Sequence, residues 1–353
     1  MKLTVLFLLI AFCGVAQFKV ETFTQLDAFD MESNFPIVVS SKNPKAAEKI
    51  NVAMHHFSLE KIFMEEDEER FSAVFPPEDE IWGASEFDYE VLANNENYFS
   101  IGITCAYTGA YSEYYTRNYT FNAITGQQVM ISDLFSEETL AVLSNKVNSR
   151  IEKEINDFIA AADSEDEYQR DQIQMYLECL EWISHEIYPA SSYYLTDSSL
   201  VVVRNRCSSH MMAALDDLWD FYVEYSLEEL NELFNYNAEA LMTGKPMDYS
   251  DSGVPVGKVL QGELGGKYPI TMIISNPYED HYAGVYWYDK IKKQIELDGE
   301  LNDQIATLVL KESVEEKETG TFELMIISDG TLEGNWIDAK GETSFGIALK
   351  LSE

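Results

Sequence analysis

Short β-strands recur every 10–14 residues from residue 256 to the end of the chain. Gly, Asn or Asp separates most of them, and no stretch of this region has the period of a helix. The segments are GKVLQGEL, YPITMIIS, YAGVYWYD, KKQIELDG, IATLVLKES, GTFELMII, LEGNWID and FGIALKLS. Eight antiparallel strands of this length predict an all-β domain over 256–353, a small barrel or sandwich of meander type. Gly334 beside Trp336 predicts a close backbone approach, with the indole ring plugging one end of a barrel.

The part of the chain before this domain mixes helices with strands. Asn43 and Pro44 stand where a helix takes its cap and its first residue. Apolar residues at helical spacing over 140–158 predict a long helix, and a second one is expected at about 165–186. Alternating segments around the Asn-rich turn ANNEN predict two paired strands. The expected fold is α+β, with antiparallel sheets packed by long helices and then the all-β domain. The segment 241–255 is rich in Gly, Pro, Ser and Asp and is expected to be a linker.

The first residues, 1–16, have the features of an export signal. One lysine precedes the apolar stretch LTVLFLLIAF, which is too short to span a bilayer as a mature helix. Small residues, Gly14 and Ala16, precede the predicted cleavage before Gln17. Cys13 follows Phe12, where lipoprotein signals need a small side chain, and this disfavours lipidation at Cys13. We expect an exported protein, periplasmic or secreted, with no membrane span in the mature chain.

Three cysteines remain after the predicted cleavage: Cys105, Cys179 and Cys207. An odd number in an exported protein allows one disulfide and one free thiol. Spacing alone does not decide the pairing, and Cys179–Cys207 is the pairing that we predict. Cys105 lies in an apolar alternation, which predicts a buried thiol rather than a nucleophile.

The chain is strongly acidic. After the predicted cleavage it has 23 Lys and Arg against 62 Asp and Glu, a net charge of −39. The densest acidic run, 59–90, holds 12 acids and two bases. Such a surface repels nucleic acid and anionic lipid and attracts cationic partners, although the same charge also serves solubility.

No motif in the sequence supplies catalytic chemistry, a metal site or a cofactor site. SHEIY lacks the second histidine of a zinc protease motif, and neither Asp-Gly turn completes a calcium loop. GxSxG, P-loop and GxGxxG patterns are absent from the sequence. The five histidines have no ligand spacing, and the adjacent His55 and His56 are expected at the surface or the boundary of a helix. We therefore assign no catalytic residue, metal ligand or cofactor.

The stretch YTGAYSEYYTRNYTFNAITGQQV, residues 107–129, is dense in tyrosine. Tyr107, Tyr119 and Phe121 continue strand alternations, so we expect these three rings to pack on one buried face. The other tyrosines follow Gly109 at a predicted connection, and connections lie at the surface and carry function. His210 follows a strand at the start of an irregular segment near two arginines. The predicted ligand-binding residues are Tyr111, Tyr114, Tyr115, Arg117 and His210.

The order of these segments resembles a pair of cell-envelope domains. NPKAAEKIN followed by FDYEVLANNENYFSIGI resembles the non-catalytic N-terminal domain of PdaC-type peptidoglycan N-acetylglucosamine deacetylases. YTGAYS, NYTFNAITGQQVMISDLF and YYLTDSSLVV resemble the C-terminal extracellular domain of the lysozyme-sensing anti-sigma factors of the RsiV type. The resemblance implies a PdaC-like α+β region over 17–105 and an RsiV-like α+β region over 106–240, both acting as extracellular recognition modules.

The sequence also departs from these families. The deacetylase catalytic domain, the transmembrane helix and the cytoplasmic sigma-binding segment have no counterpart here. Tyr111 stands where the pattern Tyr-x-Gly-Ala-His has its histidine, so a contact made by that side chain is not carried over. Neither deacetylation nor control of a sigma factor is therefore expected.

We expect an exported, non-catalytic binding module of the cell envelope that recognises a cationic protein such as lysozyme, or a cell-wall glycan, and no nucleic acid. One alternative is a cell-wall glycan hydrolase that uses two carboxylates. Another is small-ligand binding by the C-terminal barrel, in a cavity around Trp336.

Overall fold

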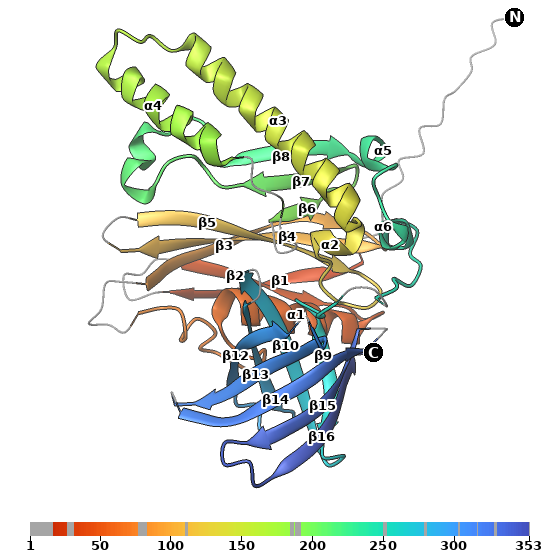
Figure 1. Ribbon diagram of the computed structural model, residues 1–353. Coiled ribbons are helices and arrows are strands. Elements are labelled where there is room, and N and C mark those ends of the chain that lie inside the picture. The colour runs from red at the N-terminus through yellow and green to blue at the C-terminus, as the bar shows by residue number, and fades with distance from the viewer. Residues whose placement is uncertain are drawn as a thin grey trace, which may run out of the picture.

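The computed structural model describes residues 17–26, 32–76, 83–109, 112–183, 187, 192–249, 253–278, 281–302, 304–315, 317–327 and 330–352. The predicted export signal, Cys13 and Tyr111 lie outside these residues. An N-terminal lobe, residues 17–249, stacks sheets and helices above a β-barrel (Figure 1). This arrangement confirms the predicted α+β fold followed by an all-β barrel. Among the described residues, no helix is both long and apolar enough to cross a membrane.

The first half of the N-terminal lobe packs one helix against antiparallel strands. β1 pairs with β2, and β3, β4 and β5 form a three-stranded sheet. The helix begins as predicted, because the Asn43 side chain accepts a hydrogen bond from the backbone N–H of Ala46. The elements are β1 (Lys19–Leu26), β2 (Glu32–Val39), α1 (Pro44–Leu59), β3 (Gly83–Asn94), β4 (Tyr98–Thr108) and β5 (Ser112–Asn122).

The second half of the lobe covers a second three-stranded sheet with the two long helices (Figure 1). The apolar stripe of α3 is buried as predicted, with Leu143, Val147 and Ile151 fully inaccessible. The elements are α2 (Ile131–Leu134), α3 (Glu137–Ala161), α4 (Glu167–Trp182), β6 (Tyr193–Leu195), β7 (Ser199–Arg204), the 3-10 helix η1 (His210–Leu215), β8 (Phe221–Ser226), α5 (Leu227–Leu230) and α6 (Tyr236–Met242).

The barrel closes because its last strand pairs with its first. Gly334 allows the predicted close approach, since a Cβ there would lie 1.8 Å from the carbonyl oxygen of Glu323. The strands are β9 (Val259–Leu264), β10 (Tyr268–Tyr278), β11 (His281–Tyr288), β12 (Ile295–Asn302), β13 (Thr307–Val314), β14 (Lys317–Ile327), β15 (Thr331–Asp338) and β16 (Ser344–Leu351).

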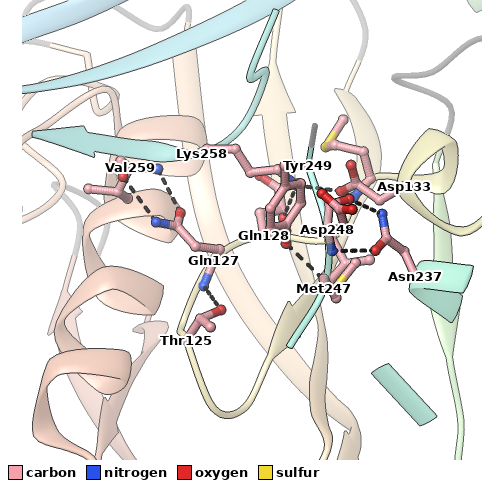
Figure 2. A network of polar contacts seen from close by, with 12 residues as sticks. Thr125, Gln127, Gln128, Asp133, Asn237, Met247, Asp248, Tyr249, Lys258 and Val259 are labelled. Atoms are coloured by element: carbon pink, nitrogen blue, oxygen red, sulfur yellow. Dashed lines mark hydrogen bonds and ion pairs between the residues drawn. The ribbon is translucent and has the colours of Figure 1, made fainter. Parts of the chain in front are cut away.

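A buried polar network joins the barrel to the N-terminal lobe (Figure 2). Lys258, just before β9, forms an ion pair with Asp133 of α2, and both side chains are almost inaccessible. The Gln127 side chain pairs with both backbone groups of Val259, at 3.0 and 2.8 Å. Lys49 of α1 donates to the carbonyl oxygen of Ser352, at 2.6 Å, and so holds the end of β16. The two halves therefore meet through specific polar contacts as well as apolar ones.

The predicted surface or boundary position is wrong for His55, which is buried, whereas His56 is half-buried. α1 lies between the strands of the lobe and the barrel wall, so the helix has little free surface. The His55 ring packs 4.9 Å from the Phe35 ring. Its Nδ1 donates to the Asn51 carbonyl oxygen, at 2.7 Å, which leaves Nε2 to accept from Arg70, at 3.0 Å. Burial lowers the pKa of His55 to about 3 and that of His56 to about 4, so both rings are neutral.

Removing the positive charge at the junction is expected to destabilise the protein. Lys258→Met leaves the Asp133 carboxylate buried without its cation, which costs about 3–5 kcal/mol of unfolding free energy. Lys350→Met, on an exposed position of β16, is the matched control and is expected to change stability by less than about 0.5 kcal/mol. Urea unfolding measures both variants. Equal midpoints for the two would contradict a role for the buried pair.

The buried histidines predict loss of stability in mild acid. The unfolded chain takes up protons near pH 6.5 and the folded chain does not, so stability is full above pH 6.5 and falls as the pH drops toward 4. Well below pH 6.5, His55 alone contributes a slope of about 1.4 kcal/mol per pH unit. Urea unfolding from pH 7 to pH 5 measures the slope. The slope of unfolding free energy against pH should be shallower by that amount in His55→Gln. Identical slopes in the variant and the parent protein would refute a neutral, buried His55.

Candidate functional site

The connection between β7 and β8, residues 205–220, is the most elaborately fixed surface segment of the N-terminal lobe, and we call it the anchored loop. One stripe of α4 holds it in place. Tyr168 donates to the Ala214 carbonyl oxygen, at 2.7 Å, and Gln172 donates to the carbonyl oxygen of Leu215, at 2.9 Å. The predicted disulfide is confirmed: Cys179, further along the same stripe, is bonded to Cys207 with the Cα atoms 5.4 Å apart.

A buried carboxylate organises the inside of the anchored loop. Asp216 is nearly inaccessible and accepts hydrogen bonds at both oxygens. The Tyr176 hydroxyl donates to it at 2.7 Å, the backbone N–H of Ser208 at 2.9 Å and the backbone N–H of Trp219 at 3.1 Å. Because a carboxylate that gains these donors is satisfied where it stands, Asp216 fixes the path of the loop and does not face a ligand.

Glu113 at the start of β5 connects the anchored loop to the tyrosine-rich strand. One carboxylate oxygen lies 2.5 Å from Arg206 Nη2, and the other lies 2.8 Å from His210 Nδ1. The predicted contact residue His210 therefore lies beside the strand that carries Tyr114. Arg206 also stands over the Trp219 ring, 5.9 Å from its centroid. These contacts make one surface from two segments about 90 residues apart.

The anchored loop displays large apolar side chains to solvent. Met211 is 79% exposed and Trp219 is 57% exposed, and Trp219 adopts a positive φ of 54° that is rare for a tryptophan. Tyr114, on β5, is also mostly exposed. Large exposed apolar side chains on a backbone that is held rigid are typical of protein-binding surfaces.

The tyrosines differ in part from their predicted places. Tyr114 and Tyr115 are residues of β5, not of a connection, because the strand already begins at Ser112. Tyr115 and Arg117 form a cation–π pair at 5.5 Å, apart from the His210 contacts, with Tyr115 beside the buried Cys105 thiol. Strand alternation places Tyr114 and Tyr115 on opposite faces of β5.

The predicted burial of the tyrosine-stretch ends is half correct. Tyr119 and Phe121 pack in the core with ring centroids 6.1 Å apart. Tyr107 is 44% exposed, although it continues the buried alternation of β4. It pairs with Glu113 near the free end of the hairpin, beyond the part of the strand that the core covers.

Among the described residues, the buried carboxylates Asp133, Asp216 and Glu312 each accept hydrogen bonds from partners within the protein. Glu312, inside the barrel, accepts from the Tyr286 hydroxyl and the Trp336 indole, both at 2.6 Å, and from the Thr319 hydroxyl, at 2.5 Å. Trp336 also stacks on Phe345, with the ring centroids 5.9 Å apart. In the part of the chain that the structure describes, no group of His, Cys, Asp and Glu is arranged to hold a metal ion. The two-carboxylate hydrolase and the barrel ligand stay predictions.

Two DUF3298 family structures are among the solved structures that this chain matches. No family model and no curated protein matches the sequence. A DUF3298 family member from Bacteroides fragilis is 13% identical with a TM-score of 0.44, covering 66% of this chain and 99% of that one. A DUF3298 family protein from Pseudomonas aeruginosa is 9% identical with a TM-score of 0.41, covering 64% and 96%. DUF3298 domains are found in PdaC- and RsiV-like proteins. At these scores the likeness indicates nothing about function.

Sequence reasoning missed most of the anchored loop. Tyr168, Gln172, Tyr176 and Cys179 follow one another at spacings of four, four and three, which places them on one face of a helix. Polar residues and a cysteine on one stripe of a helix indicate that α4 bonds to another segment of the chain, in addition to packing on the core. Trp219 gave no signal, because nothing in its neighbours requires a positive φ.

Loss of the disulfide is expected to loosen the anchored loop. The double variant Cys179→Ser, Cys207→Ser is expected to lose about 2–4 kcal/mol of unfolding free energy. Amide hydrogen exchange should rise first within residues 205–220, because α4 keeps its other core contacts. Cys105→Ala, which alters a buried free thiol outside the loop, is the control. Unchanged exchange over 205–220 in the double variant would contradict the role of the bond.

Proposed function

We propose that the protein is an exported, non-catalytic binding module that captures a cationic protein of the cell envelope or its surroundings. The observation that carries this proposal is the anchored loop, which displays Met211 and Trp219 on a fixed backbone. Fixed apolar anchors lower the ordering cost of binding, because the loop has already lost its freedom.

Charge selects the kind of partner. The chain carries a net charge of −38, so a basic protein is drawn toward it and an acidic one is repelled. Glu113, Arg206 and His210 next to the apolar anchors supply polar groups of both signs at the rim. An apolar centre with a polar rim is the usual composition of a protein interface.

The cell compartment rests on two observations. The Cys179–Cys207 disulfide favours an oxidising environment, as outside the cytoplasm. The apolar stretch after Lys2 has the length of an export signal. Both support export, and the lysozyme-sensing family that residues 106–240 resemble makes lysozyme a suitable cationic probe.

Binding of a lysozyme is expected to depend on Trp219. Trp219→Ala removes a central apolar anchor and should weaken binding at least about tenfold. Tyr236→Ala, an exposed ring on α6 away from the anchored loop, is the control and should leave the affinity within about twofold. Calorimetry at low and high salt measures both, and binding should weaken as salt rises. No binding of any lysozyme or other basic protein at low salt would refute the proposal.

A further inference from the structure

Strand β8 is an edge strand whose outer backbone groups face away from β7. Its strand neighbour in the sheet is β7, and it stands last in the order β6–β7–β8. The Glu224 carbonyl oxygen accepts from Arg150 of α3, at 2.6 Å, and the Ser226 N–H donates to the Glu229 carboxylate, at 2.8 Å. Neither contact involves β7, and backbone groups alternate in direction along an antiparallel strand. Tyr222 therefore also directs its N–H and C=O outward.

A groove of about 900 Å³ runs along this edge. α3 forms one wall, β8 forms the other, and the turn between β6 and β7 closes one end. Residues that line it include Glu154, Asp157, Ser198, Tyr222, Glu224 and Glu229. β8 has six residues, a length of about 20 Å at the usual rise of a strand. The edge is thus long enough for a short extended segment to lie beside it.

The groove has an excess of negative charge. Its two cations are already engaged: Lys153 pairs with Asp157 at 2.5 Å, and Arg150 lies on the Tyr225 ring at 3.9 Å. Among the described residues, no ion pair joins Glu154 or Glu224 to a cation. The carboxylates therefore remain for the side chains of a ligand.

We propose that this groove binds an extended peptide segment bearing lysine or arginine side chains, which adds a strand to β8. The outward N–H and C=O of Tyr222 and the outward N–H of Glu224 pair with the backbone of such a segment, whereas the Glu224 C=O stays with Arg150. Acidic side chains on the rim pair with its alternate side chains. An anionic lipid surface is repelled by the same carboxylates. A second copy of the chain is disfavoured by its own net charge of −38.

The groove adjoins the anchored loop and deepens the proposed function. β8 begins at Phe221, two residues after Trp219, so a partner held by Trp219 has its flexible segments next to the β8 edge. The inference rests on the proposed function in naming the partner's chemistry, but the edge geometry is independent of the loop. Folded-surface contacts and strand addition are therefore separable by mutation.

The test uses the whole protein and a short peptide of alternating lysine and threonine. Amide exchange measured by NMR should show new protection at Tyr222 and Glu224 when the peptide is added. Tyr222→Pro removes an outward N–H without touching the β7 ladder and should weaken binding at least about tenfold. Tyr222→Ala removes the ring but keeps the N–H, and is expected to stay within about threefold. The same peptide with glutamate in place of lysine should not bind.

Several results would overturn the inference. Equal affinity in Tyr222→Pro and the parent protein excludes strand addition, as does equal binding of a peptide methylated at alternate backbone nitrogens. Self-association that Tyr222→Pro abolishes would assign the edge to a second copy instead. Trp219→Ala should leave the affinity for the peptide unchanged and weaken the affinity for lysozyme at least about tenfold. If the peptide binds as expected and no basic protein does, the proposed function fails and the edge site stands.

Discussion

The ion pair between Lys258 and Asp133 sets how the two halves of the molecule sit on each other. Both charges are out of water, and each loses a large hydration energy that its partner and one backbone group offset. Lys258 also donates to the Gln128 carbonyl oxygen, and Asp133 accepts from the Met130 N–H, at 2.7 Å. A lysine at a slightly different place would leave both groups unpaired, so the pair tolerates one docking of the barrel on the lobe. Lys258 directly precedes β9, and Asp133 lies in the short helix α2. The barrel is thus positioned at its first residue.

Side-chain amides extend the same principle through the lobe. Gln127 pairs with both backbone groups of Val259, and Asn237 does so with Asp248, at 2.5 and 2.6 Å (Figure 2). Asn51 does the same for Val38, and Asn94 for Phe18. Each amide offers a donor and an acceptor in the geometry of a strand neighbour, so it satisfies backbone groups that no strand pairs with. These contacts join α1 to β2, β3 to the residue before β1, and the lobe to β9 of the barrel.

The periodicity of the sequence predicted most helices and strands. It failed for residues whose burial depends on contacts with other elements. The eight barrel strands and the apolar stripe of α3 could be predicted, because each has its own periodic pattern and is bounded by turn or capping residues. The β1–β2 pair was missed, since its burial follows from packing with β3 and α1 rather than from its own alternation. His55 was misplaced because a helix covered on two sides has no solvent face to reveal. For the site, sequence found His210 and Tyr114 separately, but only the fold brings Glu113 between Arg206 and His210.

Several cations of this chain are held in internal contacts, while others, such as Lys19 and Lys153, stay exposed. Lys49 and Lys258 are buried at the junction, and Arg70 donates to His55. Arg150 lies on Tyr225, while Arg206 is bound by Glu113. Each cation that is paired with an acid cancels one negative charge as well, so the net charge of −38 is unchanged by these contacts. A partner therefore meets a negative field, which is screened over about 8 Å at physiological salt. In the function that we propose, long-range attraction selects basic partners, and the fixed loop decides which of them stay bound.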